Sequence, residues 1–323
     1  MTKLMSYITT EGTKTATTEK FGRELQALGN ARKDIVALTA DLKGSVKIGY
    51  FGNDNPDRIF DVGIAEQNMI GMAAGMAKCG LVPFAATFSV FSSLRALDQI
   101  HTDICYQNLN VKLIGTHGGT SFTSGGATHH AIEDIAVLRS LANMTVICPA
   151  DGVETALATR AAAKTYGPFY IRFNRGTDYD VYNTEDYGFE IGKAVTVAEG
   201  TDLTIIACGS CVYQAIKAAE ILEKERNLSV RILDMHTVKP IDKDAIIKAA
   251  AETHAIVTVE DHTIIGGLGG AVAEVLAENG AGCKFRRLGI KDKFSPTGNR
   301  DDILAYHEID AAGIVKNVID LLK

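Results

Sequence analysis

The sequence lacks long hydrophobic runs. No segment of its 323 residues approaches the roughly 18 uninterrupted apolar residues of a transmembrane helix. Residues 1–15, MTKLMSYITTEGTKT, contain no apolar stretch followed by a small-residue cleavage site, which a secretory signal peptide requires. We therefore expect a cytoplasmic protein without a membrane partner.

The chain also lacks a strong charge bias and a cysteine framework. It has 33 basic and 39 acidic residues and a net charge of −6, which argues against a nucleic-acid partner. A local basic patch would still suffice for a small phosphorylated substrate. The six cysteines are scattered, mostly within apolar runs, which indicates reduced thiols rather than disulfides: Cys79, Cys105, Cys148, Cys208, Cys211 and Cys283.

Short β-branched segments alternate with helical patterns along the chain. Ten segments have the composition of buried strands: 34–41, 58–63, 81–87, 111–116, 144–151, 168–173, 203–209, 230–236, 255–261 and 284–290. Segments with helical periodicity separate them, for example 66–80, 93–104 and 153–166. This alternation predicts mostly parallel sheets with helices on both faces.

The length of the chain favours two domains. A polar segment rich in Tyr, Asp and Gly, residues 175–202, interrupts the alternation, and we interpret it as the linker. We therefore predict an α/β protein with two three-layer α/β/α domains, residues 1–190 and 191–323.

Two short motifs could form a redox pair and a phosphate-binding site, but the needs of local structure explain both motifs equally well. Cys208 and Cys211 form a Cys-x-x-Cys where a strand meets a helix, which suits a redox pair, yet such a junction needs only small residues. The glycine-rich segment 266–270 could hold a phosphate on backbone amides, but its spacing is not Gly-x-Gly-x-x-Gly. We interpret the first as a turn and the second as close helix-to-strand packing.

A single acidic residue, Glu66, opens an otherwise nearly uncharged helix in DVGIAEQNMIGMAAGMAKCG, residues 61–80. It follows a strand that we expect to be central, at the edge where open α/β sheets bind ligands. Apolar residues at intervals of three or four predict a buried face for this helix, and Gly71 and Gly75 predict close packing. A carboxylate so near an apolar interior needs a partner, and could share a proton with a ligand nitrogen.

Aromatic and histidine residues follow the next two strands. Phe88 and Phe91 are either core residues or a platform on which a flat heterocycle stacks. A loop rich in Gly, Ser and Thr then carries His117, His129 and His130. A metal site with nearby acidic residues is one alternative, but such a loop at a strand end favours proton transfer or oxyanion binding.

These motifs, in this order, resemble the second half of transketolase from about residue 15 onward. The similar segments are ADLKGS (40–45), the Glu66 segment, ATFSVF (86–91), the histidine loop (115–134), VTVEDHTIIGGLGGAVAEVL (257–276) and GIKDKFSPTGNRDDILAYHEID (289–310). The resemblance implies an enzyme of carbohydrate metabolism that transfers a two-carbon ketol unit between sugar phosphates, such as pentose phosphates.

The same resemblance implies thiamine diphosphate as the cofactor. The family's catalytic glutamate, which Glu66 matches, forms a hydrogen bond with a pyrimidine ring nitrogen of this cofactor. Phe88 and Phe91 would stack on the pyrimidine, with Asp41 and Leu42 near it.

Substrate-binding residues also follow from the resemblance. His129 matches a catalytic histidine that handles a proton or the oxyanion at the substrate hydroxyl, and His117 matches a histidine at the substrate phosphate. Ser45 and Arg175 match phosphate-binding positions, and Arg172 is a neighbour with the same expected role.

The chain lacks the family's Gly-Asp-Gly motif and the asparagine that follows it. In the family these residues hold the diphosphate and its magnesium or calcium ion, so no metal ligand is expected on this chain. The resemblance therefore implies the C-terminal subunit of a split transketolase. Its partner would be a separate N-terminal, diphosphate-binding subunit, in a two-plus-two tetramer.

Three positions depart from the family pattern and leave the substrate open. Glu19 stands where a phosphate-binding arginine is usual, Leu94 replaces a tyrosine beside the pyrimidine, and His130 replaces a glutamine. A specialised sugar phosphate is therefore as credible as a pentose phosphate. The alternatives are the beta subunit of a 2-oxo-acid dehydrogenase first component, a non-catalytic scaffold paralogue, and deoxyxylulose-phosphate synthase, which is normally one longer chain.

Overall fold

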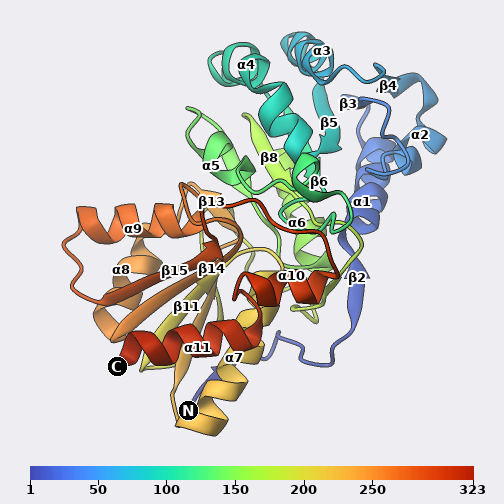
Figure 1. Cartoon of the computed structure of the whole chain (residues 1–323). Helices are drawn as coiled ribbons and strands as arrows, with labels where there is room; N and C mark the ends of the chain where they lie inside the picture. Colours follow the sequence, from blue (N-terminus) through green and yellow to red (C-terminus); the bar gives the residue numbers. More distant parts are fainter.

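Two sheets, each flanked by helices, organise the chain (Figure 1). The computed structural model describes residues 1–323. The strands of the first sheet are β3 (Ile35–Thr39), β4 (Ile59–Asp61), β5 (Val82–Phe88), β6 (Lys112–Thr116), β7 (Thr145–Ile147), β8 (Phe169–Arg172) and β13 (Thr237–Lys239). Their order is β13-β7-β8-β6-β5-β3-β4, and all neighbours are parallel except β13 and β7.

The second sheet has six strands: β1 (Lys3–Leu4), β10 (Val195–Glu199), β11 (Leu203–Ala207), β12 (Val230–Asp234), β14 (Ala255–Thr263) and β15 (Lys284–Ile290). Their order is β1-β10-β12-β11-β14-β15, with β1 and β10 antiparallel to their neighbours and the rest parallel. A separate antiparallel pair joins β2 (Lys14–Ala16) to β9 (Thr177–Tyr179).

The helices of the first half are α1 (Thr17–Ala31), α2 (Gly49–Asp54), α3 (Glu66–Lys78), α4 (Leu97–Gln99), α5 (Asp134–Arg139) and α6 (Gly152–Lys164). Those of the second half are α7 (Cys211–Arg226), α8 (Lys243–Glu252), α9 (Leu268–Glu278), α10 (Arg300–Tyr306) and α11 (Ala311–Leu322). No helix is apolar over a length that would cross a membrane. The predicted α/β class is confirmed, and each of the ten predicted segments overlaps a strand.

Three local expectations are wrong. The strand before Glu66, β4, is an edge strand rather than a central one, because it is three residues long and pairs only with β3. A Cβ added at Gly71 or Gly75 would meet no atom within 4 Å, so these glycines do not serve close packing. The polar segment 175–202 is not wholly a linker, since it contains β9 and β10.

The two sheets exchange short strands. β1, at the start of the chain, pairs with β10 of the second sheet, and β13, from the second half, pairs with β7 of the first. The division of the chain into two domains at residue 190 therefore stays a proposal, and it applies to each half without its exchanged strand.

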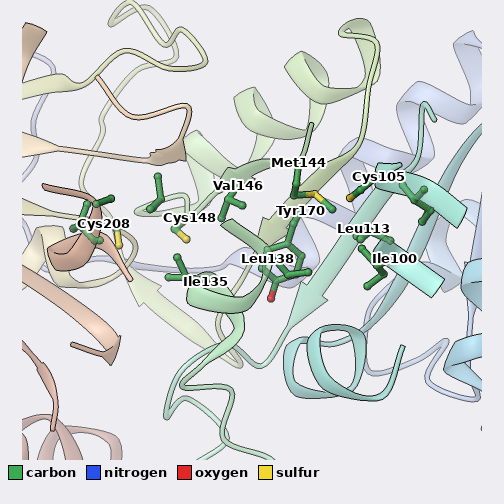
Figure 2. Packing of buried hydrophobic residues seen from close by; sticks show 14 of the residues in the cluster. Ile100, Cys105, Leu113, Ile135, Leu138, Met144, Val146, Cys148, Tyr170 and Cys208 are labelled. Atoms are coloured by element: carbon green, nitrogen blue, oxygen red, sulfur yellow. The ribbon is translucent and has the colours of Figure 1, made fainter. Parts of the chain in front are cut away.

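A continuous hydrophobic cluster crosses from one sheet to the other. Figure 2 shows it running from Ile100 and Leu113 past Val146 to Cys148 and Cys208. Cys148 follows β7 and Cys208 follows β11, and the Gly209 amide donates a hydrogen bond of 3.0 Å to the Cys148 carbonyl. This cluster joins the two halves, and each half has a further cluster largely of its own.

Both ambiguous motifs have structural roles. Cys208 and Cys211 are buried free thiols. A hydrogen bond with Cys148 and burial raise the pKa of Cys208, and burial raises that of Cys211, which opposes a reactive thiolate. At the glycine-rich turn, the amides of Leu268 and Gly269 donate to the Glu260 carboxylate at 2.7 and 2.8 Å. A Cβ at Gly267 would lie 2.1 Å from a Glu260 oxygen, so close packing is confirmed.

Candidate active site

Five aromatic rings from two segments, the end of β5 and the histidine loop after β6, meet at this edge of the sheet. Phe88 stacks on Phe91 at 5.5 Å between ring centroids and on His117 at 3.9 Å. Phe122 and His129, both from the histidine loop, lie 5.0 Å apart, and His129 lies 5.5 Å from Phe91. The structure thus brings together four residues selected from the sequence. It adds Phe122, the only phenylalanine among the glycines, serines and threonines of this loop.

Glu66 lies at the first turn of α3 and is 5% exposed. Its Oε1 accepts a hydrogen bond of 3.1 Å from Arg95 Nη1, and Oε2 has no hydrogen-bond partner in the chain. Arg95 is the last residue of a π-helical turn that begins at Phe91, and its guanidinium lies 3.8 Å above the Phe91 ring. The expected partner of the buried carboxylate is therefore an arginine 29 residues away, which no local motif signals.

The two histidines of the cluster differ in environment. His117 is buried, and burial, together with the nearby charge of Arg175, lowers its pKa to about 4, so its ring is neutral at pH 7. His117 Nδ1 lies 3.0 Å from the Thr116 hydroxyl. His129 is partly exposed, with Nδ1 2.8 Å from the Thr128 hydroxyl. His117 can therefore act as a neutral hydrogen-bonding group, and His129 remains accessible to a ligand.

An open cavity of about 720 Å³ adjoins the aromatic cluster. Phe88, His117 and Phe122 form its aromatic wall, and Ser45 and Arg175 also line it. The Arg175 guanidinium lies 4.5 Å above the Phe122 ring and forms no ion pair. The volume is in the usual range for a small-molecule site, and four of the residues selected from the sequence line it.

Arg172 does not line this cavity. Its side chain is 5% exposed, and Nε donates to Asp134 Oδ2 at 2.9 Å. Nη2 donates to the carbonyls of Ala131 and Asp261 at 3.2 and 2.8 Å. These contacts give Arg172 a structural role between the two halves of the chain.

Asp41 and Leu42 lie just past the end of β3, outside the lining of the cavity. Asp41 is exposed, has a left-handed backbone with φ of 58°, and donates its amide to Asp61 Oδ1 at 2.9 Å. The backbone here is held on the same edge of the sheet as Glu66, but the structure shows no contact between the two residues.

The second half of the chain anchors the histidine loop. Both oxygens of Asp261 accept the Thr120 amide, at 3.2 and 3.1 Å, and Oδ1 also accepts the Thr120 hydroxyl at 3.0 Å. Gly119 has φ of 58°, and a Cβ there would lie 2.3 Å from Asp261 Oδ2. Only glycine allows this close approach, which fixes the loop two residues after His117.

Groups of His, Cys, Asp and Glu that could hold a metal ion are absent, including around the three loop histidines. The site is thus a buried carboxylate, a set of stacked rings and a polar cavity. These parts suit a flat, nitrogen-containing heterocycle beside a polar, anionic ligand.

Comparisons with known proteins identify the family. Residues 13–178 match the model of the transketolase pyrimidine-binding domain, and residues 192–314 match that of the transketolase C-terminal domain. One relative is a Methanocaldococcus jannaschii protein named as a transketolase C-terminal section. It is 45% identical over 94% of this chain and 95% of its own length. One of the subunits of an apulose-4-phosphate transketolase from Phocaeicola vulgatus is 40% identical over 94% of this chain and 97% of its own.

Solved structures agree with this assignment. One, described as a split-gene transketolase in an inactive β4 tetramer, is 40% identical and has a TM-score of 0.86, covering 95% of this chain and 98% of that one. A transketolase from Campylobacter jejuni, 21% identical with a TM-score of 0.79, shares the fold over 98% of this chain and 48% of its own. The chain therefore belongs to the transketolase family, of which it contains the pyrimidine-binding and C-terminal domains.

Proposed function

We propose that this chain is the C-terminal subunit of a split transketolase, which transfers a two-carbon ketol unit between anionic sugars with thiamine diphosphate. The observation that carries the proposal is Glu66, a buried carboxylate with one oxygen paired to Arg95 and the other free. Arg95 in turn lies over the Phe91 ring, which stacks on Phe88. Packing alone gives no reason for such a group.

The residues present fit the pyrimidine end of the cofactor. Glu66 Oε2 can bond a protonated ring nitrogen, and the Phe88 and Phe91 rings offer a face for stacking. When bound there, thiamine diphosphate would supply the carbanion chemistry that ketol transfer needs. The chain's own contribution is to orient the pyrimidine and to keep water away from it.

The histidines act on the substrate side. His129, next to the Phe91 ring and partly exposed, is positioned to exchange a proton with a substrate hydroxyl or to bond its oxyanion. His117, neutral at pH 7, offers a ring nitrogen for a hydrogen bond at the wall of the cavity, where Ser45 and Arg175 receive the anionic end of the sugar.

A second subunit completes the site in this proposal. The chain contains no Gly-Asp-Gly motif, so the diphosphate and its magnesium or calcium ion would be bound by a separate N-terminal subunit. A two-plus-two assembly follows if the pair dimerises like other members of the family, with the cytoplasm as its location.

Relatives suggest a range of substrates. One is the apulose-4-phosphate transketolase subunit described above. Another comes from a Clostridium species and is 39% identical over 88% of this chain; it is named as a subunit of a 6-deoxy-6-sulfo-D-fructose transketolase. We infer that the substrate carries a terminal phosphate or a similar anion and is not restricted to the pentose phosphates. These relatives favour ketol transfer over the oxidative decarboxylation of a 2-oxo acid.

Reconstitution tests the proposal. The chain, copurified with its N-terminal partner, is assayed for ketol transfer over a panel of phosphorylated ketoses, with and without thiamine diphosphate. We expect cofactor-dependent transfer that Glu66→Ala reduces by at least about a hundredfold, which corresponds to about 2.7 kcal/mol in the barrier.

Glu220→Ala, on the helix α7, is the matched control and should leave the rate unchanged. Activity of Glu66→Ala within about twofold of the wild type would refute the assignment, as would lipoyl-dependent turnover of a 2-oxo acid.

A further inference from the structure

The cavity beside the aromatic cluster has an excess of cationic side chains. Four cations and two carboxylates line it: Lys14, Lys47, Arg175 and Arg300 against Glu19 and Asp301. Arg300 is already compensated, because its Nη2 lies 2.7 Å from Asp178 Oδ1 and 2.9 Å from the Ser210 hydroxyl. The net charge left at the cavity wall is positive, which suits an anionic group of the ligand.

Lys47 is the cation on the wall formed by the loop before α2. This loop also carries Ser45, and both residues line the cavity. The Lys47 ammonium lies 3.3 Å from Glu19 Oε1, with 34% of the lysine side chain and 51% of the glutamate side chain exposed. A pair this exposed adds little to stability, so the pairing alone does not explain why Lys47 is held here.

The backbone at Lys47 is fixed in an unusual conformation. Its φ is 63°, which is strained for a residue with a Cβ. The helix α1 meets this loop at Gly22, where a Cβ would lie 2.4 Å from the Lys47 carbonyl oxygen. Glu19 lies one turn earlier on the same helix, so this close approach brings the carboxylate beside the ammonium. Strained residues held by their surroundings are found at ligand sites.

Lys47 is also distinguished from the other free cations of the cavity. The Lys14 ammonium lies over the Tyr179 ring at 4.1 Å, and Arg175 lies over Phe122. Lys47 instead has a carboxylate partner that can hold the ammonium at the wall while the cavity is empty. A phosphate or sulfonate of the ligand, each with three acceptor oxygens, can then compete with the carboxylate for the same ammonium.

We propose that Lys47 is a specificity-determining residue that binds the terminal anionic group of the sugar substrate, with Glu19 as the residue that positions it. The proposal rests on the transketolase function proposed above and specifies how that site selects its substrates. The chemistry recognised is a phosphate or sulfonate at the end of the sugar opposite the reacting carbonyl. Lys47 and Arg175, on different segments of the cavity wall, would share this group.

Kinetics of the reconstituted enzyme test this role. Lys47→Gln should raise KM for a phosphorylated ketose by at least about tenfold and change kcat by less than about twofold, because the lost contact is remote from the reacting carbon. KM for the same ketose without its phosphate should stay within about twofold. Inorganic phosphate, used as a competitive inhibitor, should show a Ki raised by a similar factor. Lys47→Arg keeps the charge and should restore most of the affinity.

A matched control lies in the same loop. Lys43 is exposed and does not line the cavity, so Lys43→Gln removes an equal charge four residues away and should leave both KM values unchanged. Equal KM increases for the two ketoses, no increase for either, or an increase with Lys43→Gln as large as with Lys47→Gln would each overturn the role of Lys47. Absence of ketol transfer in the wild-type complex would instead refute the proposed function, so the two failures are distinguishable.

Discussion

Arg95 Nη1 lies 3.1 Å from Glu66 Oε1, and the same guanidinium lies 3.8 Å above the Phe91 ring. One side chain thus fixes both the buried carboxylate and one of the two rings expected to hold the cofactor. Arg95 is itself half-exposed, so the pair lies near the surface of this chain rather than deep in the core. Its removal should therefore affect the site more than the fold.

We predict that Arg95→Met weakens thiamine diphosphate binding by the reconstituted complex by about tenfold, or about 1.4 kcal/mol. The reason is that both Glu66 and Phe91 lose the group that orients them. A double-mutant cycle with Glu66→Gln separates the two contributions, since the effect of Arg95→Met should shrink once the carboxylate is gone. Calorimetric titration of the cofactor gives the affinities of all four proteins without relying on activity. Fully additive effects would show that the ion pair does not orient the carboxylate.

The two arginines selected from the sequence should behave in opposite ways. Arg172 is buried against Asp134, so Arg172→Met leaves an unpaired buried carboxylate and should lower the free energy of unfolding by about 3–5 kcal/mol. Arg175 lines the open cavity, and Arg175→Met should change that free energy by less than about 0.5 kcal/mol while raising KM for a phosphorylated ketose. Urea denaturation and steady-state kinetics measure the two effects. Equal stability of both variants would contradict the structural role given to Arg172.

Gly119→Ala should both destabilise the chain and impair the site. The new methyl group would overlap Asp261 at 2.3 Å, and the backbone φ of 58° disfavours a Cβ, so we expect a loss of about 1–3 kcal/mol. The histidine loop would have to move, which should also lower kcat/KM. Gly71→Ala is the matched control: its methyl group would meet open space within a helix, and the isolated chain should gain about 0.5–1 kcal/mol. Denaturation of both variants at one pH makes the comparison.

A buried carboxyl pair makes stability depend on pH. Burial raises the pKa of Asp234, which accepts the Tyr182 hydroxyl at 2.6 Å, to about 7, and burial also raises the pKa of nearby Glu154. The folded state therefore holds a proton that the unfolded chain releases at about pH 3.9. The stability that this proton contributes is complete below that pH and is lost as the pH rises through 7.

We predict that the stability advantage of the wild type over Asp234→Asn is larger at pH 6 than at pH 8. For a folded pKa of about 7, the difference between the two pH values is on the order of 1 kcal/mol. Burial lowers the pKa of histidines such as His262, to about 4, and their contribution to stability has the opposite pH dependence. The wild type and Asp234→Asn both contain these histidines, so their contribution cancels in the comparison. Urea denaturation at both pH values is the measurement. An advantage that does not change with pH would mean that Asp234 is ionised throughout.

The main strands could be predicted from the sequence because a buried parallel strand needs an apolar run. Segments with helical periodicity separate each of these runs from the next. Strands β1 and β13 were missed because neither lies within such an apolar run. β1 has two residues and β13 three, too few for any periodicity, and their pairing depends on segments that lie far away in the chain. The edge position of β4 also follows from pairing rather than from its own residues.

Within the site, the residues found from the sequence were those that stand inside a recognisable motif. Phe88, Phe91, His117 and His129 do meet. Arg95 and Lys47 were missed, because each acquires its role from a partner in another element, Glu66 in one case and Glu19 in the other. The position of Arg172 in the sequence suggested a phosphate-binding role, but the burial of its side chain could be known only from the fold.

The exchange of β1 and β13 also limits how this chain can be divided. A protease that cuts between the main bodies of the two halves should yield a nicked complex that stays together, since each piece still supplies an edge strand to the other's sheet. Recombination that replaced one half alone would leave a sheet without its edge. The pyrimidine-binding and C-terminal domains should therefore be inherited as a single unit.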